Sequence, residues 1–187
     1  MDSIINEEQI EASLPDTSKS FLLKGIGSNI EIYRDSFGIP HVIAKSTYDA
    51  FFGQGFVTAQ DRLWHMDYDR HRAYGRWAEV IGRSALDHDK MMRCFQIDDS
   101  VRKDYLALNT ETKCMLDAYA DGVNAYIKNE DSMPVEYILL NMSPSVWNPW
   151  DSLAVYKVRH IMMGVFESKL WRDHLVDLIG GDRSSSL

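Results

Sequence analysis

Apolar residues recur at steps of three and four positions along residues 52–82, which predicts a long helix with one buried face. This stripe consists of Ala59, Leu63, Met66, Ala73, Tyr74, Trp77 and Ile81. Arg70 falls on the same stripe, so its guanidinium should point into the protein. A buried arginine is stable only where carboxylates or carbonyls accept its N–H groups. We therefore expect a structural ion pair at Arg70 and assign this helix no catalytic role.

Short apolar runs separated by turn residues precede this helix and predict a small β element. Strands are expected at residues 21–23 and 30–33, joined as a hairpin through the GIGSN turn. A third strand is expected at residues 39–43, where Pro40 favours an edge or entry position. Ser46 or Thr47 should cap a helix starting at Tyr48, and the long helix should end near Gly82.

Helical periodicity continues through most of the remaining chain. One helix should start at Asp87 or Asp89 and either continue or restart through residues 101–108, and the next should follow the cap at Asn109 or Thr110. Residues 134–140 form a short helix or strand, and a last long helix capped by Asp151 or Ser152 should run to about residue 179. The chain is thus predicted to be mostly helical, and the missing sheet is expected on another chain.

Composition and charge narrow the function classes. The chain has 187 residues with 20 basic and 28 acidic side chains, a net charge of −8. This excess of acidic residues argues against nucleic-acid binding and against electrostatic docking on anionic membranes. The sequence contains no run of 18 apolar residues, so we expect no transmembrane helix. Residues 1–20 form an acidic, polar leader without the features of a signal peptide, which predicts a cytoplasmic chain. Removal of a signal from a longer precursor would make it periplasmic or secreted.

Candidate catalytic groups are few. His65, Asp67, Asp69 and His71 include pairs at helical four-residue spacing that could hold a metal. No HExxH pattern is present and arginines interleave, so a solvated, salt-bridged face is the preferred interpretation. Asp87 and Asp89 are explained by helix capping, and the two cysteines, Cys94 and Cys114, are expected to be buried free thiols. With no GxSxG elbow and no phosphate loop, the sequence alone offers no complete active site.

Five sequence blocks follow one another along the chain: IEIYRDSFGIPHVIA at 30–44, GQGFVTAQDRLWHMD at 53–67, AYGRWAEVIG at 73–82, AYADGVNAYI at 118–127 and SVWNPWDSLAV at 145–155. In their order and spacing they resemble the α chain of penicillin acylases. The family also includes cephalosporin acylases and N-acyl homoserine lactone acylases. The resemblance implies an α+β fold in which a mostly helical α subunit, residues 21–187, completes a four-layered αββα N-terminal nucleophile hydrolase domain with a separate β chain.

The resemblance also implies the chemistry and the partner. A self-cleaved precursor supplies the β chain, whose first residue is a Ser with its own α-amine as base. The substrate is a small N-acyl compound whose amide bond is hydrolysed, without an organic cofactor. On the α chain, a Met followed four residues later by a Phe contributes to the acyl pocket, and Met162 with Phe166 match that spacing. Val165 stands where some penicillin acylases have an Arg.

A structural calcium is a further implication of the resemblance. Family members often bind it through one α-chain Glu together with β-chain oxygens. The best register places Lys169 at that position, with Glu167 two residues earlier, so Glu167 is the candidate ligand. The alternative function is a non-catalytic helical interaction module, which should be monomeric and folded when expressed alone. An acylase α chain should instead leave too much apolar surface uncovered without its β chain.

Overall fold

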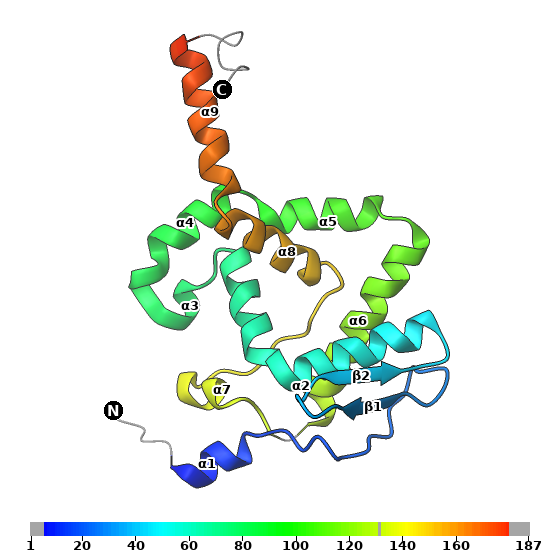
Figure 1. The fold of residues 1–187 in the computed structure, drawn as a ribbon. Helices are drawn as coiled ribbons and strands as arrows, with labels where there is room; N and C mark the ends of the chain where they lie inside the picture. Colours follow the sequence, from blue (N-terminus) through cyan, green and yellow to red (C-terminus); the bar gives the residue numbers. More distant parts are fainter. Residues whose placement is uncertain (1–5, 131, 180–187) are drawn as a thin grey trace.

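The computed structural model describes residues 6–130 and 132–179, and the side chains of residues 165, 166 and 179 lie outside this description. The described helices are α1 (Glu7–Ala12), α2 (Thr47–Ala73), α3 (Ala78–Ile81), the 3-10 helix η1 (Gly82–Ala85), α4 (Leu86–Cys94), α5 (Ile97–Ala107), α6 (Thr110–Asn129), α7 (Val135–Leu140), α8 (Asp151–Met162) and α9 (Val165–Ile179). In the same residues, β1 (Glu31–Arg34) and β2 (Pro40–Ile43) form a two-stranded sheet beside α2 (Figure 1). The predicted mostly helical α+β chain is confirmed.

The hairpin is formed by a different pair of runs from the predicted one. β1 and β2 are antiparallel, with Glu31 opposite Ile43. The connecting turn is held by Asp35, whose side chain accepts the N–H groups of residues 37 and 39 at 2.9 and 3.0 Å. The strand at 39–43 is confirmed, but residues 21–23 form no strand and instead pack Phe21 and Leu23 against the core. The turn chemistry of Asp35 explains the difference, because it closes the shorter connection.

Helix α2 is the central element, and its glycines allow α6 to lie directly against it. Ser46 caps α2, as predicted, by accepting the N–H of Asp49 at 3.1 Å. A Cβ at Gly55 would lie 2.0 Å from a backbone oxygen of α6, and a Cβ at Gly122 would lie 2.0 Å from a backbone oxygen of α2. Only glycine permits such an approach from both sides. The α2–α6 pair is therefore a backbone-to-backbone contact.

The long helix predicted to reach Gly82 is wrong beyond Ala73. Helix α2 ends there, and Gly75 turns the chain with φ +60°. The short α3 follows and ends at Gly82, whose φ is +75°. Asp89, expected to cap its own helix, instead accepts the N–H groups of residues 77 and 78 at 3.0 and 2.7 Å, and so caps α3. Asp89 therefore stabilises the start of a helix, as predicted, but the helix is α3, which precedes it in the sequence and packs against it.

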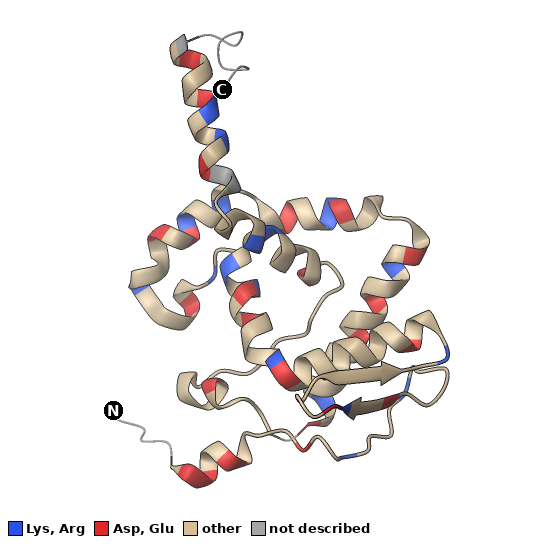
Figure 2. Cartoon of the chain, in the orientation of Figure 1, with Lys and Arg blue, Asp and Glu red and all other residues tan. Residues whose placement is uncertain are grey.

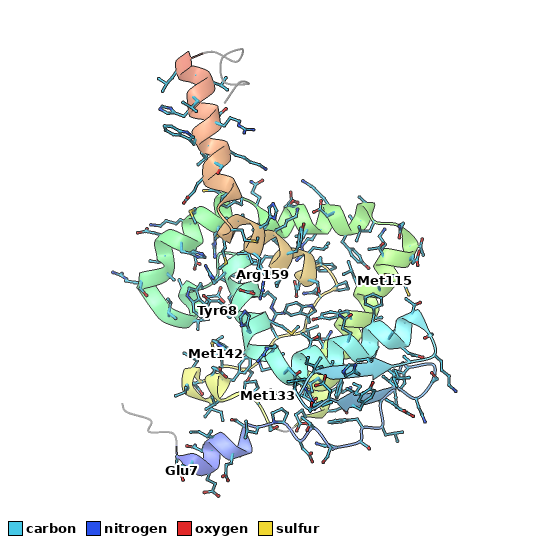
Figure 3. The ribbon with its side chains drawn as sticks, viewed as in Figure 1. Glu7, Tyr68, Met115, Met133, Met142 and Arg159 are labelled. Atoms are coloured by element: carbon cyan, nitrogen blue, oxygen red, sulfur yellow. The ribbon has the colours of Figure 1, made fainter. Side chains whose placement is uncertain are left out.

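Two apolar clusters lie on either side of α2. The first lies between α2, α6 and α7 and contains Phe56, Ala59, Leu63, Met66, Ala120, Val123, Tyr126, Tyr137 and Trp147. Met133 and Met142, which flank α7, pack against it (Figure 3). The second joins the end of α2 to α4, α5 and α8 and contains Ala73, Met92, Ile97, Val101, Ala154 and Val158. Helix α2 thus belongs to both clusters.

The predicted last long helix is two helices. Helix α8 ends at Met162, and Gly164, with φ +79°, turns the chain before α9 begins. A left-handed glycine ends a helix because it lets the next N–H groups bond back to the last turn. Helix α9 then projects away from the rest of the described chain (Figure 1). Any side-chain face that spans residues 162–166 is therefore not the face of a continuous helix.

Both cysteines are free, as predicted, but their predicted burial is wrong because Cys94 and Cys114 are exposed. Cys94 ends α4 and directs its thiol to the Lys90 carbonyl at 3.2 Å. Cys114 lies in the first turns of α6, whose buried residues begin only at Ala118. Helical periodicity predicted the helices that carry the two cysteines, but not where the neighbouring helices stop covering them.

Candidate functional site

Arg70 is the centre of a buried polar network that joins α2, the 145–148 loop and α8. Its Nε and Nη2 donate to Asp67 Oδ1 at 3.1 and 2.6 Å, and its Nη1 donates to Asp151 Oδ2 at 3.1 Å. The carbonyl oxygens of Ser145 and Val146 accept further bonds at 3.2 and 2.8 Å. We call Arg70, Asp67, Asp151 and the residues bonded to them the Arg70 network. The predicted structural ion pair is confirmed.

Hydroxyl groups complete the Arg70 network. Tyr137 of α7 donates its O–H to Asp67 Oδ2 at 3.0 Å, and Tyr74 donates to Asp151 Oδ1 at 2.6 Å. Burial and the neighbouring Asp67 carboxylate raise the pKa of Tyr137, and burial with Asp151 raises that of Tyr74. Both phenols are therefore held protonated as donors.

The charges of the Arg70 network stabilise one another. Burial alone would raise the pKa of Asp67, but the hydrogen bond from His71 and the charge of Arg70 outweigh it, so this pKa is lowered. The hydrogen bond to Asp67 raises the pKa of His71. The His71 Nδ1 atom lies 2.8 Å from the Asp67 carbonyl oxygen, which can only accept, so this nitrogen carries a proton. With its donors and acceptors matched, the network is a structural unit rather than a reactive one.

The interpretation of His65, Asp67, Asp69 and His71 as a solvated face is wrong, although their salt-bridging is confirmed. Asp67, Asp69 and His71 are buried, because α7 and α8 cover this part of α2. Asp69 accepts two bonds from Arg159 of α8, at 2.9 and 2.6 Å. Arg159 belongs to α8, which packs against α2 (Figure 3). In the described residues these four side chains form no metal site.

The residues assigned to the acyl pocket lie at the α8–α9 junction. Met162 ends α8 with 53% of its surface exposed, and the adjacent Met163 is 77% exposed. Glu167 is exposed in the first turn of α9. The side chain of Phe166 lies outside the described residues, so the predicted pairing of Met162 with Phe166 stays a prediction.

The junction belongs to a set of exposed apolar side chains on α8 and α9. Its members include Tyr156, Met162, Met163, Leu170, Trp171 and Leu178, each more than half exposed. We call these six residues the α8–α9 surface. A second group of exposed apolar residues lies around the hairpin: Leu22, Tyr33, Phe37, Ile39 and Ile43. Large apolar side chains gathered in this way mark surfaces that a partner covers.

Glu167 alone cannot make a calcium site. Calcium takes six to eight oxygen ligands, and the described residues contain no group of three or more acidic, His or Cys side chains placed to hold a metal. Taken alone, the described residues therefore do not fit a complete calcium site. Among the helices described, none combines the length and apolar character needed to cross a membrane.

The fold belongs to a known structural class. The chain superposes on the thermostable penicillin G acylase from Alcaligenes faecalis with a TM-score of 0.66 and 28% sequence identity, covering 84% of this chain and 88% of that chain. A chain of that acylase is thus similar to this one over most of both lengths.

Residues 29–187 match the family described as penicillin amidase, and the chain belongs to that family. It is 38% identical over 182 residues to penicillin acylase 2 proenzyme from Pseudomonas sp. (strain SE83), covering 97% of this chain and 24% of the relative. It is 36% identical over 134 residues to penicillin G acylase from Escherichia coli (69% and 16%). An acyl-homoserine lactone acylase from Pseudomonas syringae pv. syringae is 34% identical over 156 residues (83% and 19%). The chain spans about a quarter of the first relative's length.

Proposed function

We propose that this chain is the α subunit of a heterodimeric acylase that hydrolyses the amide bond of N-acyl compounds. Its family membership is the observation that carries the proposal, because the relatives are penicillin acylases and acyl-homoserine lactone acylases. The first relative is named a proenzyme and is about four times as long as the matched region, which supports a β chain cut from the same precursor. Together the two chains would form the four-layered αββα domain.

The proposed reaction places the nucleophile on the β chain. The hydroxyl of its N-terminal Ser attacks the amide carbonyl while the α-amine of the same residue takes the proton. The amine product leaves with a proton, and water hydrolyses the resulting ester to release the acid. The Arg70 network is fully bonded internally and has no part in these steps. The network holds α2, α7 and α8 together and so positions α8, whose last residue is Met162.

The proposed contribution of this chain to the substrate site is apolar. Met162 and Phe166 would line the acyl pocket, and the exposure of Met162 leaves its thioether available for such a contact. The rest of the α8–α9 surface would pack on the β chain. The substrates proposed are penicillin- or cephalosporin-type amides, N-acyl homoserine lactones and N-acyl amino acids or amines.

Glu167 is the proposed α-chain ligand of a structural calcium. Its carboxylate is exposed at the start of α9 and can supply one or two of the required oxygens. The remaining ligands would come from the β chain. The ion would then tie the α8–α9 junction to that chain.

The test is expression of the complete coding sequence followed by mass spectrometry of the purified protein. We expect two chains, the second beginning with Ser, and release of acid from penicillin G, an N-acyl homoserine lactone or an N-acyl amino acid. An unprocessed protein that hydrolyses no amide would refute the proposal. Residues 1–187 expressed alone should be aggregated or loosely folded, whereas a monomer with a cooperative urea transition would favour the non-catalytic module.

A further inference from the structure

A cavity of about 300 Å³ lies between the end of α2, α4, α5 and the loop that precedes α8. Its lining includes the side chains of Arg70, Arg76, Arg93 and Arg102, together with Asp98 and Asp151. We call it the arginine cavity. Figure 2 shows basic segments on α2, α4 and α5. The chain as a whole carries a net charge of −8, so a concentration of guanidinium groups needs a specific explanation.

The two carboxylates of the arginine cavity are already bonded. The Asp151 carboxylate accepts hydrogen bonds from Arg70, from the Tyr74 hydroxyl and from the backbone N–H of Asn148, the last at 2.8 Å. Asp98 accepts the Nε of Arg102 at 3.0 Å. Arg70 is also bonded to Asp67, and Arg76 to Glu79, so Arg93 is the one arginine of the cavity that donates to no carboxylate of the described residues.

Three of the arginines have N–H groups to spare. Arg93 donates only its Nε, to the Gly75 carbonyl at 2.9 Å, so neither of its Nη atoms has a partner among the described residues. Arg76 uses Nε and Nη2 for Glu79, at 2.9 and 2.7 Å. Over residues 6–130 and 132–179, no bond to the Nη1 of Arg76 or to either Nη of Arg102 is present.

Neighbouring groups hold these arginines in position. A Cβ at Gly75 would lie 2.8 Å from the Cγ of Arg93, so glycine at this position makes room for that side chain. The Arg102 guanidinium lies over the Trp150 ring, 4.6 Å from its centroid. Arg76, Arg93 and Arg102 are otherwise exposed, so these contacts reduce, but do not remove, the conformational freedom that they lose on binding a ligand.

We propose that the arginine cavity binds one small oxyanion, inorganic phosphate or a carboxylate compound of similar size. Arginine is suited to such ligands because its parallel N–H groups match two oxygens of a phosphate or carboxylate. Arg93 supplies the main contact, and Arg76 and Arg102 supply the others. The anion joins the turn between α2 and α3 to α4 and α5, close to the start of α8. Amide hydrolysis does not require this site, so the two proposals stand separately.

The test is calorimetric titration of inorganic phosphate into the protein expressed from its complete coding sequence, with ionic strength held constant by sodium chloride. We expect one saturable site per chain. Arg93→Met keeps the length of the side chain but removes its donors, and it should weaken binding about tenfold or more. The matched control is Arg83→Met, because Arg83 is exposed on η1 and lies outside the cavity.

Each other outcome contradicts the proposal. An absence of saturable phosphate binding, or equal weakening by Arg83→Met, would show that charge alone was responsible. If the wild type binds no phosphate and Arg93→Met lowers its melting temperature, an acidic side chain of the remaining protein fills the cavity instead. If Arg93→Met fails to fold, Arg93→Lys is the second variant, because it keeps the positive charge but loses the paired N–H groups of the guanidinium. An unchanged affinity for phosphate in Arg93→Lys would also refute the site.

Discussion

Arg70 and Asp151 lie 81 positions apart in the sequence but form a buried ion pair, with 3.1 Å between Nη1 and Oδ2. The side chains are only 7% and 1% exposed. Arg70 is near the end of α2, and Asp151 is the first residue of α8. The pair therefore determines how α8, and with it the residues proposed for the acyl pocket, is attached to the central helix.

Replacing Arg70 by Met should strongly destabilise the protein. The variant leaves the buried carboxylates of Asp67 and Asp151 without their cation, and loss of one partner from a buried pair costs about 3–5 kcal/mol. The free energy of unfolding in urea measures this loss. Arg62→Met, an exposed change on the same helix, should alter stability by about 0.5 kcal/mol or less. Equal stability of the two variants would contradict the structural role of Arg70.

The stability of the protein should depend on the protonation of His71. Its pKa is raised above the ordinary 6.5 because it hydrogen-bonds to Asp67. A raised folded-state pKa means that this stabilisation is complete below pH 6.5 and is lost as pH rises through the folded-state pKa. Between pH 6 and 9, wild type should therefore lose more stability than His71→Asn. Identical slopes of unfolding free energy against pH would refute this coupling.

The stability of the protein should also depend on the ionisation of Asp67, but this contribution is lost at low pH rather than at high pH. Its lowered pKa means that its contribution is present above the ordinary value of 3.8 and is lost as pH falls through the folded-state pKa. Acid unfolding of Asp67→Asn should accordingly show a shallower pH dependence below pH 4 than that of the wild type.

Introducing a single methyl group at Gly55 should disrupt the contact between α2 and α6. The new Cβ would lie 2.0 Å from the Tyr119 carbonyl oxygen, which is backbone and cannot rotate away. Overpacking typically costs about 1–3 kcal/mol, and a backbone clash belongs at the upper end. The control is Gln54→Ala, an exposed position one residue earlier. A urea midpoint for Gly55→Ala equal to that of Gln54→Ala would contradict the observed contact.

The sequence predicted local features well where one helix carried the whole signal. The apolar stripe identified Arg70 as buried because periodicity reports the inward face directly. It could not identify Asp151 as the partner, because an 81-residue separation leaves no spacing rule to apply. Asp69 was assigned to solvent for the same reason, since the covering side chain, Arg159, comes from α8.

The sequence predicted one continuous helix through the candidate pocket residues, and the structure has two. The resemblance placed Met162, Phe166 and Glu167 on one helix, whereas Gly164 turns the chain between α8 and α9. A single glycine in an apolar pattern can be tolerated within a helix or end it, and only its φ distinguishes the two. The family blocks fixed the identity of the segment, but the backbone conformation had to come from the structure.

If Glu167 ligates calcium, chelation should affect the wild type more than a variant lacking this carboxylate. Treatment with EDTA should lower the melting temperature of the processed wild-type protein and leave that of Glu167→Gln unchanged, because a ligand bound only to the folded state stabilises it. Glu136→Gln, on α7, serves as the control and should respond to EDTA like the wild type. An equal response of Glu167→Gln and wild type would remove Glu167 from the ligand set.

Truncation of Met162 should alter substrate choice rather than stability. The side chain is 53% exposed at the end of α8, so its loss creates no cavity in either apolar cluster. If it lines the acyl pocket, Met162→Ala should lower kcat/KM roughly tenfold for a substrate with a bulky apolar acyl group and much less for an acetyl analogue. Met91→Ala, at a comparably exposed Met on α4, should leave both values unchanged. Equal losses for the two substrates would indicate a defect in assembly with the β chain, and no loss for either would exclude Met162 from the pocket.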